Sequence, residues 1–170
     1  GQHLVFSFAG EESYTGLVQY NLAAGIIVVA NRINDPRIQE AWKLKVPMVL
    51  IPGDPQDQRI PSVDIDNVDG AFQAVDHLAQ LGHRQIVFLN GPSDSKYSID
   101  RLAGYQKALK RNHLPFHKHL VWELDFTQEG AYAAMKKLLS TGPPPTAVLV
   151  INDFSAMGAL RAAKEMGCQV

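Results

Sequence analysis

Three side chains suited to holding a polar ligand follow separate apolar runs of the chain: Arg101, Phe126 and Asn152. A guanidinium presents a rigid, planar set of N–H donors that suits vicinal hydroxyls, carboxylates or purine acceptors. The amide of Asn152 can both donate and accept hydrogen bonds, and the ring of Phe126 could stack on the face of a sugar or a base. Together these residue types favour recognition of a small polar metabolite.

Each of the three residues also has a simpler interpretation. Arg101 could be a surface arginine or could cap a helix, and residue type alone favours that interpretation. Asn152 could be a turn residue, because Asn and Asp commonly end strands and precede helices. Phe126 could belong to the hydrophobic core, as an aromatic residue that follows a strand often does.

Short apolar runs, which alternate with amphipathic stretches, predict the strands that must position these residues. The runs are bounded by Gly, Pro, Asn or Asp and lack strict polar alternation, which is typical of strands buried on both faces of a parallel sheet. Strands are therefore predicted at residues 4–8, 26–29, 48–51, 86–89, 120–124 and 147–151.

Helices are predicted between these strands from their capping residues and apolar stripes. The first is expected to begin at Pro36 after an Asp35 cap, and the others to follow Asn67, the loop before residues 102–109, Thr127 and Asp153. Asp153 is expected to cap the last helix. The alternation predicts an α/β fold with right-handed βα crossovers. Ligands in such sheets bind beyond the carboxyl ends of the strands. This rule selects the loops at residues 66–69, 90–100, 125–127 and 152–153.

Three segments carry a family likeness: IPSVDIDNVDGAFQAVDHLAQLGHRQIVFLNGP at residues 60–92, RLAGYQKAL at 101–109, and PPTAVLVINDFSAMGALRAAKEMG at 144–167. In their order and spacing they resemble the LacI/GalR transcription regulators over most of the chain. The resemblance implies a periplasmic-binding-protein-like fold, with two Rossmann-like lobes of parallel sheet and an effector held in the cleft. The core is expected to be incomplete here, without the family's closing strands or its DNA-binding headpiece.

The resemblance also implies roles for individual residues. Arg101, Phe126 and Asn152 match positions that contact effector in the family, and Asp69 and Tyr97 match positions that sometimes reach it. We place the boundary between the lobes near residues 82–85, which divides the chain into residues 1–83 and 84–170. Asp69 is then expected to contact the ligand from the first lobe and the other residues from the second.

The resemblance predicts the effector-sensing core of a bacterial repressor that binds a sugar, a sugar phosphate or a nucleobase. The regulator would bind operator DNA through a headpiece and act as a homodimer. The helix at residues 154–166 would lie partly at the dimer interface. Its apolar surface, formed by Ala156, Met157, Ala159 and Ala162, exceeds a single stripe. The alternative is a periplasmic sugar-binding protein of an ABC transporter, which uses the same fold.

Charge and motif content exclude several other functions. With 16 basic and 17 acidic side chains, the net charge of −1 offers no basic field to neutralise phosphates, so this stretch is not expected to bind DNA itself. The single cysteine and the absence of a leader pattern favour a cytoplasmic protein outside the membrane. His117 and His119 lack a third ligand nearby, so no metal or other cofactor is expected. No catalytic motif is present, and an enzyme is not expected. An enzyme on a doubly wound sheet is the third alternative, because fold does not fix function.

Overall fold

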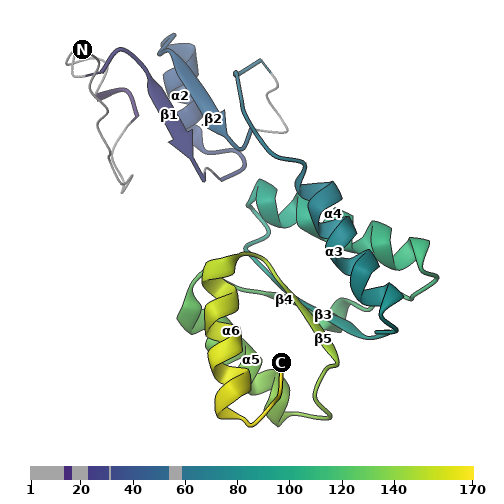
Figure 1. Cartoon of the computed structure of the whole chain (residues 1–170). Coiled ribbons are helices and arrows are strands. Elements are labelled where there is room, and N and C mark those ends of the chain that lie inside the picture. The colour runs from purple at the N-terminus through teal and green to yellow at the C-terminus, as the bar shows by residue number, and fades with distance from the viewer. Residues whose placement is uncertain (1–13, 17–22, 31, 54–58) are drawn as a thin grey trace. The chain divides into compact units, whose positions relative to one another are not determined.

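The computed structural model in Figure 1 describes residues 14–16, 23–30, 32–53 and 59–170. The chain divides into two compact units, Gly1–Ile65 (unit 1) and Asp66–Val170 (unit 2). The strand predicted at residues 4–8 lies outside the described residues. Among the described residues, no helix is long and apolar enough to cross a membrane.

In the described part of unit 1, two parallel strands accompany a helix. Strand β1 (Ile26–Val29) pairs in parallel with β2 (Met48–Ile51), as their apolar runs predict. Helix α2 (Pro36–Lys43) begins at the predicted proline, and the carboxylate of Asp35 caps it by accepting a hydrogen bond from the backbone N–H of Arg37. One face of the strands packs against this helix in a core of Val28, Ile38, Ala41, Val46, Met48, Leu50 and Ile60.

Unit 2 contains a three-stranded parallel sheet in the order β4-β3-β5. The central strand β3 (Ile86–Asn90) is buried along its whole length, between β4 (Val121–Glu123) and β5 (Ala147–Val150). The parallel sheets of both units confirm the predicted α/β class. The helices of unit 2 are α3 (Asn67–Gln80), α4 (Lys96–Arg111), α5 (Gln128–Ser140), α6 (Asp153–Glu165) and the short 3-10 helix η1 (Lys118–Leu120).

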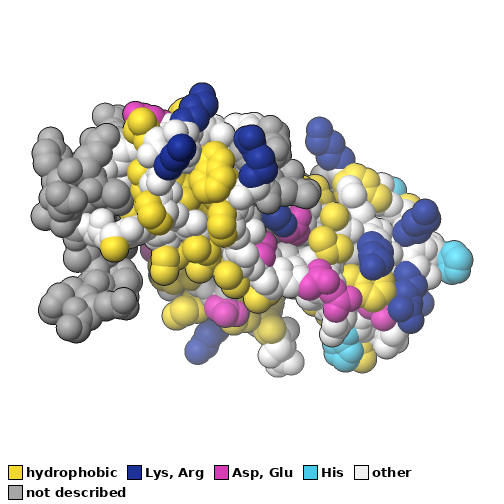
Figure 2. All heavy atoms as spheres, turned by 90° about the horizontal axis from the view of Figure 1, so that it is seen from above, with side chains coloured by type: hydrophobic (Ala, Val, Ile, Leu, Met, Phe, Trp, Pro, Cys, Tyr) yellow, Lys and Arg dark blue, Asp and Glu magenta, His cyan; other side chains and the backbone are white. Residues whose placement is uncertain are grey.

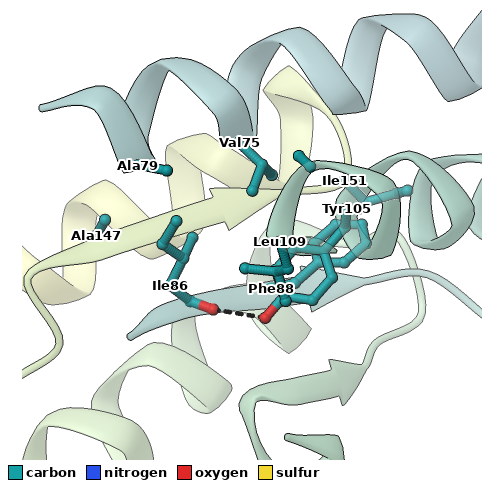
Figure 3. Packing of buried hydrophobic residues seen from close by; sticks show 9 residues of the cluster. Val75, Ala79, Ile86, Phe88, Tyr105, Leu109, Ala147 and Ile151 are labelled. Carbon is teal, nitrogen blue, oxygen red and sulfur yellow. Dashed lines mark hydrogen bonds between the residues drawn. The ribbon is translucent and has the colours of Figure 1, made fainter. Parts of the chain in front are cut away.

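Alternate residues of β3 face two separate cores, because side chains along a strand point to opposite faces. Ile86 and Phe88 pack with α3 and α4, whereas Val87 and Leu89 pack with α5 and α6. Figure 3 shows the first core, in which the Tyr105 hydroxyl donates to the Ile86 carbonyl at 2.9 Å. Burial raises the pKa of Tyr105 to about 12. Unit 2 is therefore a sheet between two helical layers.

The predicted lobe boundary does not coincide with the division of the structure. We placed it between residues 83 and 84, whereas unit 2 begins at Asp66 and includes all of α3. The apolar stripe of α3 packs against α4 and β3, through Val75 and Ala79 among others. Asp69, assigned from sequence to the first lobe, consequently lies in unit 2.

The apolar surface of α6 divides between two faces. Ala159 and Ala162, which we expected at an interface, are 5% and 0% exposed and pack in the core against α5 and the sheet. They therefore cannot contact a partner. Met157, which we also expected in this surface, is 59% exposed, and Phe154 and Leu160 are 55% and 51% exposed. Their spacing of three residues places them on one helix face.

Candidate functional site

The carboxyl ends of β3, β4 and β5 share one edge of the sheet, because the three strands are parallel and in register. The loops that leave this edge lead directly into the N-termini of α4, α5 and α6. Open α/β sheets bind ligands at such edges. Four of the five predicted site residues lie on these loops or on the first turns of α4: Tyr97, Arg101, Phe126 and Asn152.

Arg101 is partly buried and is held from two directions. Its Nε donates to the side-chain oxygen of Asn67 at 3.0 Å, and one terminal nitrogen donates to the backbone carbonyl of Ile151. No carboxylate within the described part of the chain forms an ion pair with it. The structure thus places a cation with neutral acceptors at the edge of the sheet, and part of its N–H fork donates to no described residue.

Of two other predicted residues, Tyr97 lies close to Arg101, whereas the contacts of Asp69 are with residues of α3 and its cap. Tyr97 is one helical turn earlier on α4, and its ring centre is 5.9 Å from the guanidinium carbon of Arg101. Asp69 belongs to the first turn of α3, where its carboxylate accepts a hydrogen bond from the side chain of Gln73. Its backbone N–H donates to Asp66, the cap of that helix, at 2.8 Å. Within the described residues, Asp69 forms neither a hydrogen bond nor an ion pair with Arg101.

Phe126 occupies a strained turn at the end of β4. Its φ of 67° lies in the left-handed region, which a non-glycine residue adopts at a cost of about 1–3 kcal/mol. The neighbouring Asp125 accepts a hydrogen bond from the Thr127 hydroxyl at 2.7 Å, which lowers the pKa of Asp125, and Thr127 caps α5. The turn is thus fixed on both sides of the ring.

The ring of Phe126 also packs partly against the core, as the simpler interpretation proposed. It lies so close to Gly91 that a Cβ added there would be 2.2 Å from the ring. Gly91 follows β3 and was not singled out from the sequence. Its lack of a side chain allows the ring to lie across the carboxyl end of the central strand.

Asn152, rather than Asp153, caps the last helix. Its side-chain oxygen accepts a hydrogen bond from the backbone N–H of Ser155 at 2.7 Å, and Asp153 is already the first helical residue. The cap was therefore predicted one residue too late. The turn interpretation of Asn152 is correct for its oxygen, whereas its amide nitrogen makes no hydrogen bond with any described residue.

Sequence reasoning missed three buried polar residues near this edge: Asn67, Asn90 and Ser98. The Asn90 amide donates to the Ser98 carbonyl at 3.2 Å. Among the described residues, the Asn90 side-chain oxygen and the Ser98 hydroxyl have no hydrogen-bond partner. The loops selected from the sequence at residues 66–69 and 90–100 contain all three residues, but residue type alone did not single them out there.

The rings of His117 and His119 are 5.4 Å apart. Within the described ranges, no group of three His, Cys, Asp or Glu side chains could hold a metal ion.

The comparison with protein families matches residues 9–170 to the family described as periplasmic binding proteins and the sugar-binding domain of the LacI family. The chain belongs to the LacI family. The family resemblance in the three sequence segments is thereby confirmed, and with it the periplasmic-binding-protein-like fold.

Several known proteins similar to this LacI-family chain are transcriptional regulators. It is 34% identical to the HTH-type transcriptional regulator AglR of Rhizobium meliloti (strain 1021), over 94% of this chain and 45% of that protein. The crystal structure of a LacI-family regulatory protein from Chloroflexus aggregans matches with a TM-score of 0.83 and 34% identity, covering 96% of this chain and 60% of that one.

A third similar protein is the regulator CelR, whose structure is a complex with cellobiose. It matches with a TM-score of 0.82 and 33% identity, covering 91% of this chain and 48% of that one. The LacI-family chain spans about half the length of the curated regulators that it matches.

Proposed function

We propose that this chain is the effector-sensing core of a bacterial LacI-type transcriptional regulator. It binds a small polar metabolite, a sugar or a sugar derivative, at the carboxyl edge of the β4-β3-β5 sheet. The observation that carries the proposal is Arg101, a partly buried cation held by neutral acceptors. Ligand oxygens that accept from its unused N–H groups form charge-assisted hydrogen bonds, which are about twice as strong as neutral ones.

The other predicted residues complete the proposed site. The rings of Phe126 and Tyr97 supply apolar faces for a sugar ring, and the amide nitrogen of Asn152 donates to a hydroxyl. The strained backbone of Phe126 supports a functional position for its ring, since such strain tends to persist where a site requires it. Asp69 is the weakest candidate, because its carboxylate already accepts a hydrogen bond from Gln73.

Two comparisons support a sugar-sensing regulator over a periplasmic transport protein. AglR is an HTH-type regulator, and CelR was solved with cellobiose. The regulator acts in the cytoplasm, and another part of the protein contacts the DNA. On the face shown in Figure 2, Lys and Arg side chains are scattered among hydrophobic and acidic ones instead of forming a basic stripe. The relatives are regulators and not enzymes, and we infer that this protein does not turn over its ligand.

A thermal-shift screen of the intact protein tests this function. The panel contains cellobiose, ribose, glucose 6-phosphate and adenine, one or more for each ligand class. A ligand at 100 times its dissociation constant stabilises the fold by about 2.7 kcal/mol, which raises the melting temperature by about 5–10 °C. We expect such a shift with a sugar, and no turnover of that sugar. A flat response to every compound would contradict the proposal.

The same sugar must change the binding of the intact regulator to DNA, because only a difference in affinity between two conformations can transmit a signal. We expect a gel-shift midpoint for a pseudo-palindromic operator to move when the sugar is added. The 170-residue chain alone should cause no shift at physiological salt. Tight, sequence-specific retardation by this chain alone would place DNA contacts within it and contradict our assignment.

We further propose that α6 contributes to a homodimer through Phe154, Met157 and Leu160. These large apolar side chains are more than half exposed on one helix face, which is typical of a surface that a partner covers. In a two-fold symmetric dimer the same patch occurs on both copies. Substituting Met157→Glu and Leu160→Glu together should therefore bury carboxylates at the interface and raise the dimer dissociation constant at least about tenfold.

Analytical ultracentrifugation of the intact regulator measures this effect. Ala133→Glu is the matched control, because Ala133 is exposed on the neighbouring helix α5 and outside the patch. The control should sediment as the parent does. An unchanged dimer in the double variant, with circular dichroism equal to that of the parent, would rule out this face as the interface.

A further inference from the structure

Asn67 is a buried polar residue that directly contacts Arg101. It is the first residue of α3, and only 3% of its surface is exposed. Its side-chain oxygen accepts from the Nε of Arg101 at 3.0 Å, and the Ile151 carbonyl accepts from the same guanidinium. Both acceptors are neutral. They orient the guanidinium without cancelling its charge, whereas a carboxylate would cancel it.

The backbone around Asn67 is held in place by close helix packing. Gly104 of α4 lies against Val68, so that a Cβ on Gly104 would be only 2.2 Å from the Val68 carbonyl oxygen. The carboxylate of Asp66 caps α3 immediately before Asn67. The backbones of α3 and α4 therefore meet at Val68, the residue after Asn67, and at Gly104, three residues after Arg101. This close packing fixes the distance between Asn67 and Arg101.

We propose that Asn67 is a positioning residue for Arg101, which sets the plane of the guanidinium and directs its unused N–H groups toward the ligand. This inference rests on the proposed function. A long arginine side chain loses considerable rotamer freedom on binding, and an acceptor that fixes it beforehand removes that cost from ligand binding. Asn67 acts through Arg101 and need not touch the ligand.

The type of acceptor determines the strength of the site. An aspartate at position 67 would also orient the guanidinium, but its charge would form a buried ion pair and weaken hydrogen bonds from Arg101 to a ligand. An alanine would leave the Nε–H without this partner and the side chain without a fixed plane. The neutral amide provides orientation while it leaves the positive charge to the ligand.

Hydrogen exchange of the Arg101 Nε–H tests the orientation without any ligand. In the ¹⁵N-labelled protein we expect Asn67→Ala to accelerate this exchange roughly tenfold, because a hydrogen bond to a charged group is lost. The exposed Arg161 serves as internal reference and should not change. Asn67→Asp, which restores an acceptor, should restore slow exchange. Equal Arg101 exchange rates in the parent and Asn67→Ala would overturn the proposal. Asn67→Ser provides the same test if the alanine variant does not fold.

Calorimetric titration with cellobiose then tests the consequence for binding. Asn67→Ala should raise the dissociation constant roughly tenfold while the urea midpoint of a folded variant shows that unit 2 remains intact. Equal cellobiose affinity in the parent and Asn67→Ala would overturn the positioning role. If the parent binds neither cellobiose nor any other compound of the thermal-shift panel, the proposed function fails, and the exchange measurement still decides whether Asn67 orients Arg101.

Discussion

Replacing Gly158 with alanine is expected to destabilise the protein by about 2–3 kcal/mol. Gly158 lies where α6 crosses the start of α5, and a Cβ added there would be 1.9 Å from the backbone carbonyl oxygen of Gln128. Real Cβ atoms essentially never come closer than 3.0 Å to such an atom. Because the obstacle is backbone, the two helices would have to move apart by about 1 Å and loosen the core beneath them.

Urea denaturation measures this loss, and Gly70→Ala provides a matched control. Gly70 is also helical, but a Cβ added there would have no heavy atom within 4 Å. Alanine at this position should stabilise the protein by up to about 1 kcal/mol through helix propensity alone. If Gly158→Ala lowers the free energy of unfolding and Gly70→Ala raises it, the effect at Gly158 comes from packing. A Gly158→Ala variant as stable as Gly70→Ala would show that α5 and α6 do not cross so closely.

Arg101→Ala is expected to weaken binding of the sugar identified by the thermal-shift screen by about 10- to 100-fold. The substitution removes the charged donor at the edge of the sheet, and hydrogen bonds to charged groups contribute about 1.5–3 kcal/mol each. Arg101→Lys should not restore affinity, because an ammonium lacks the planar fork that contacts Asn67, Ile151 and the ligand at the same time.

Calorimetric titration of the folded variants provides the measurement. Arg111→Ala is the control, because Arg111 lies on the same helix with 62% of its side chain exposed and lies near Asp76 instead of the sheet edge. Its affinity for the sugar should equal that of the parent. If Arg101→Ala also binds as the parent does, Arg101 only ties α3 and α4 to the end of β5, and the ligand site lies elsewhere.

Local features of the sequence were sufficient to predict the class of fold and most of its elements. Strands β1 and β2 have the predicted bounds, and β3 extends one residue beyond its predicted run. An apolar run flanked by Gly, Pro, Asn or Asp carries its own signal, because buried parallel strands need continuous hydrophobicity and cannot continue through turn residues. The start of α2 at Pro36 was predicted for the same reason, since capping depends on chain neighbours.

The direction in which each helix buries its side chains was decided only by tertiary contacts. On α6, Ala159 and Met157 are both apolar, yet Ala159 is 5% exposed and Met157 is 59% exposed. Small residues suit the tight crossing at Gly158, where α5 leaves no room for larger ones. This preference depends on another segment of the chain, 30 residues earlier, and no local pattern expresses it.

The division of the chain and the partners of Arg101 also depended on contacts between distant residues. The apolar stripe of α3 could pack against the core of either lobe. Its packing against α4 places the helix, together with Asp69, in unit 2. The bond from Arg101 to Asn67 spans 34 residues, and that to Ile151 spans 50. Sequence could identify Arg101 as a candidate, but only the folded sheet and helices bring a neutral amide and a backbone carbonyl to its guanidinium, because hydrogen-bond geometry is set by where distant backbones meet.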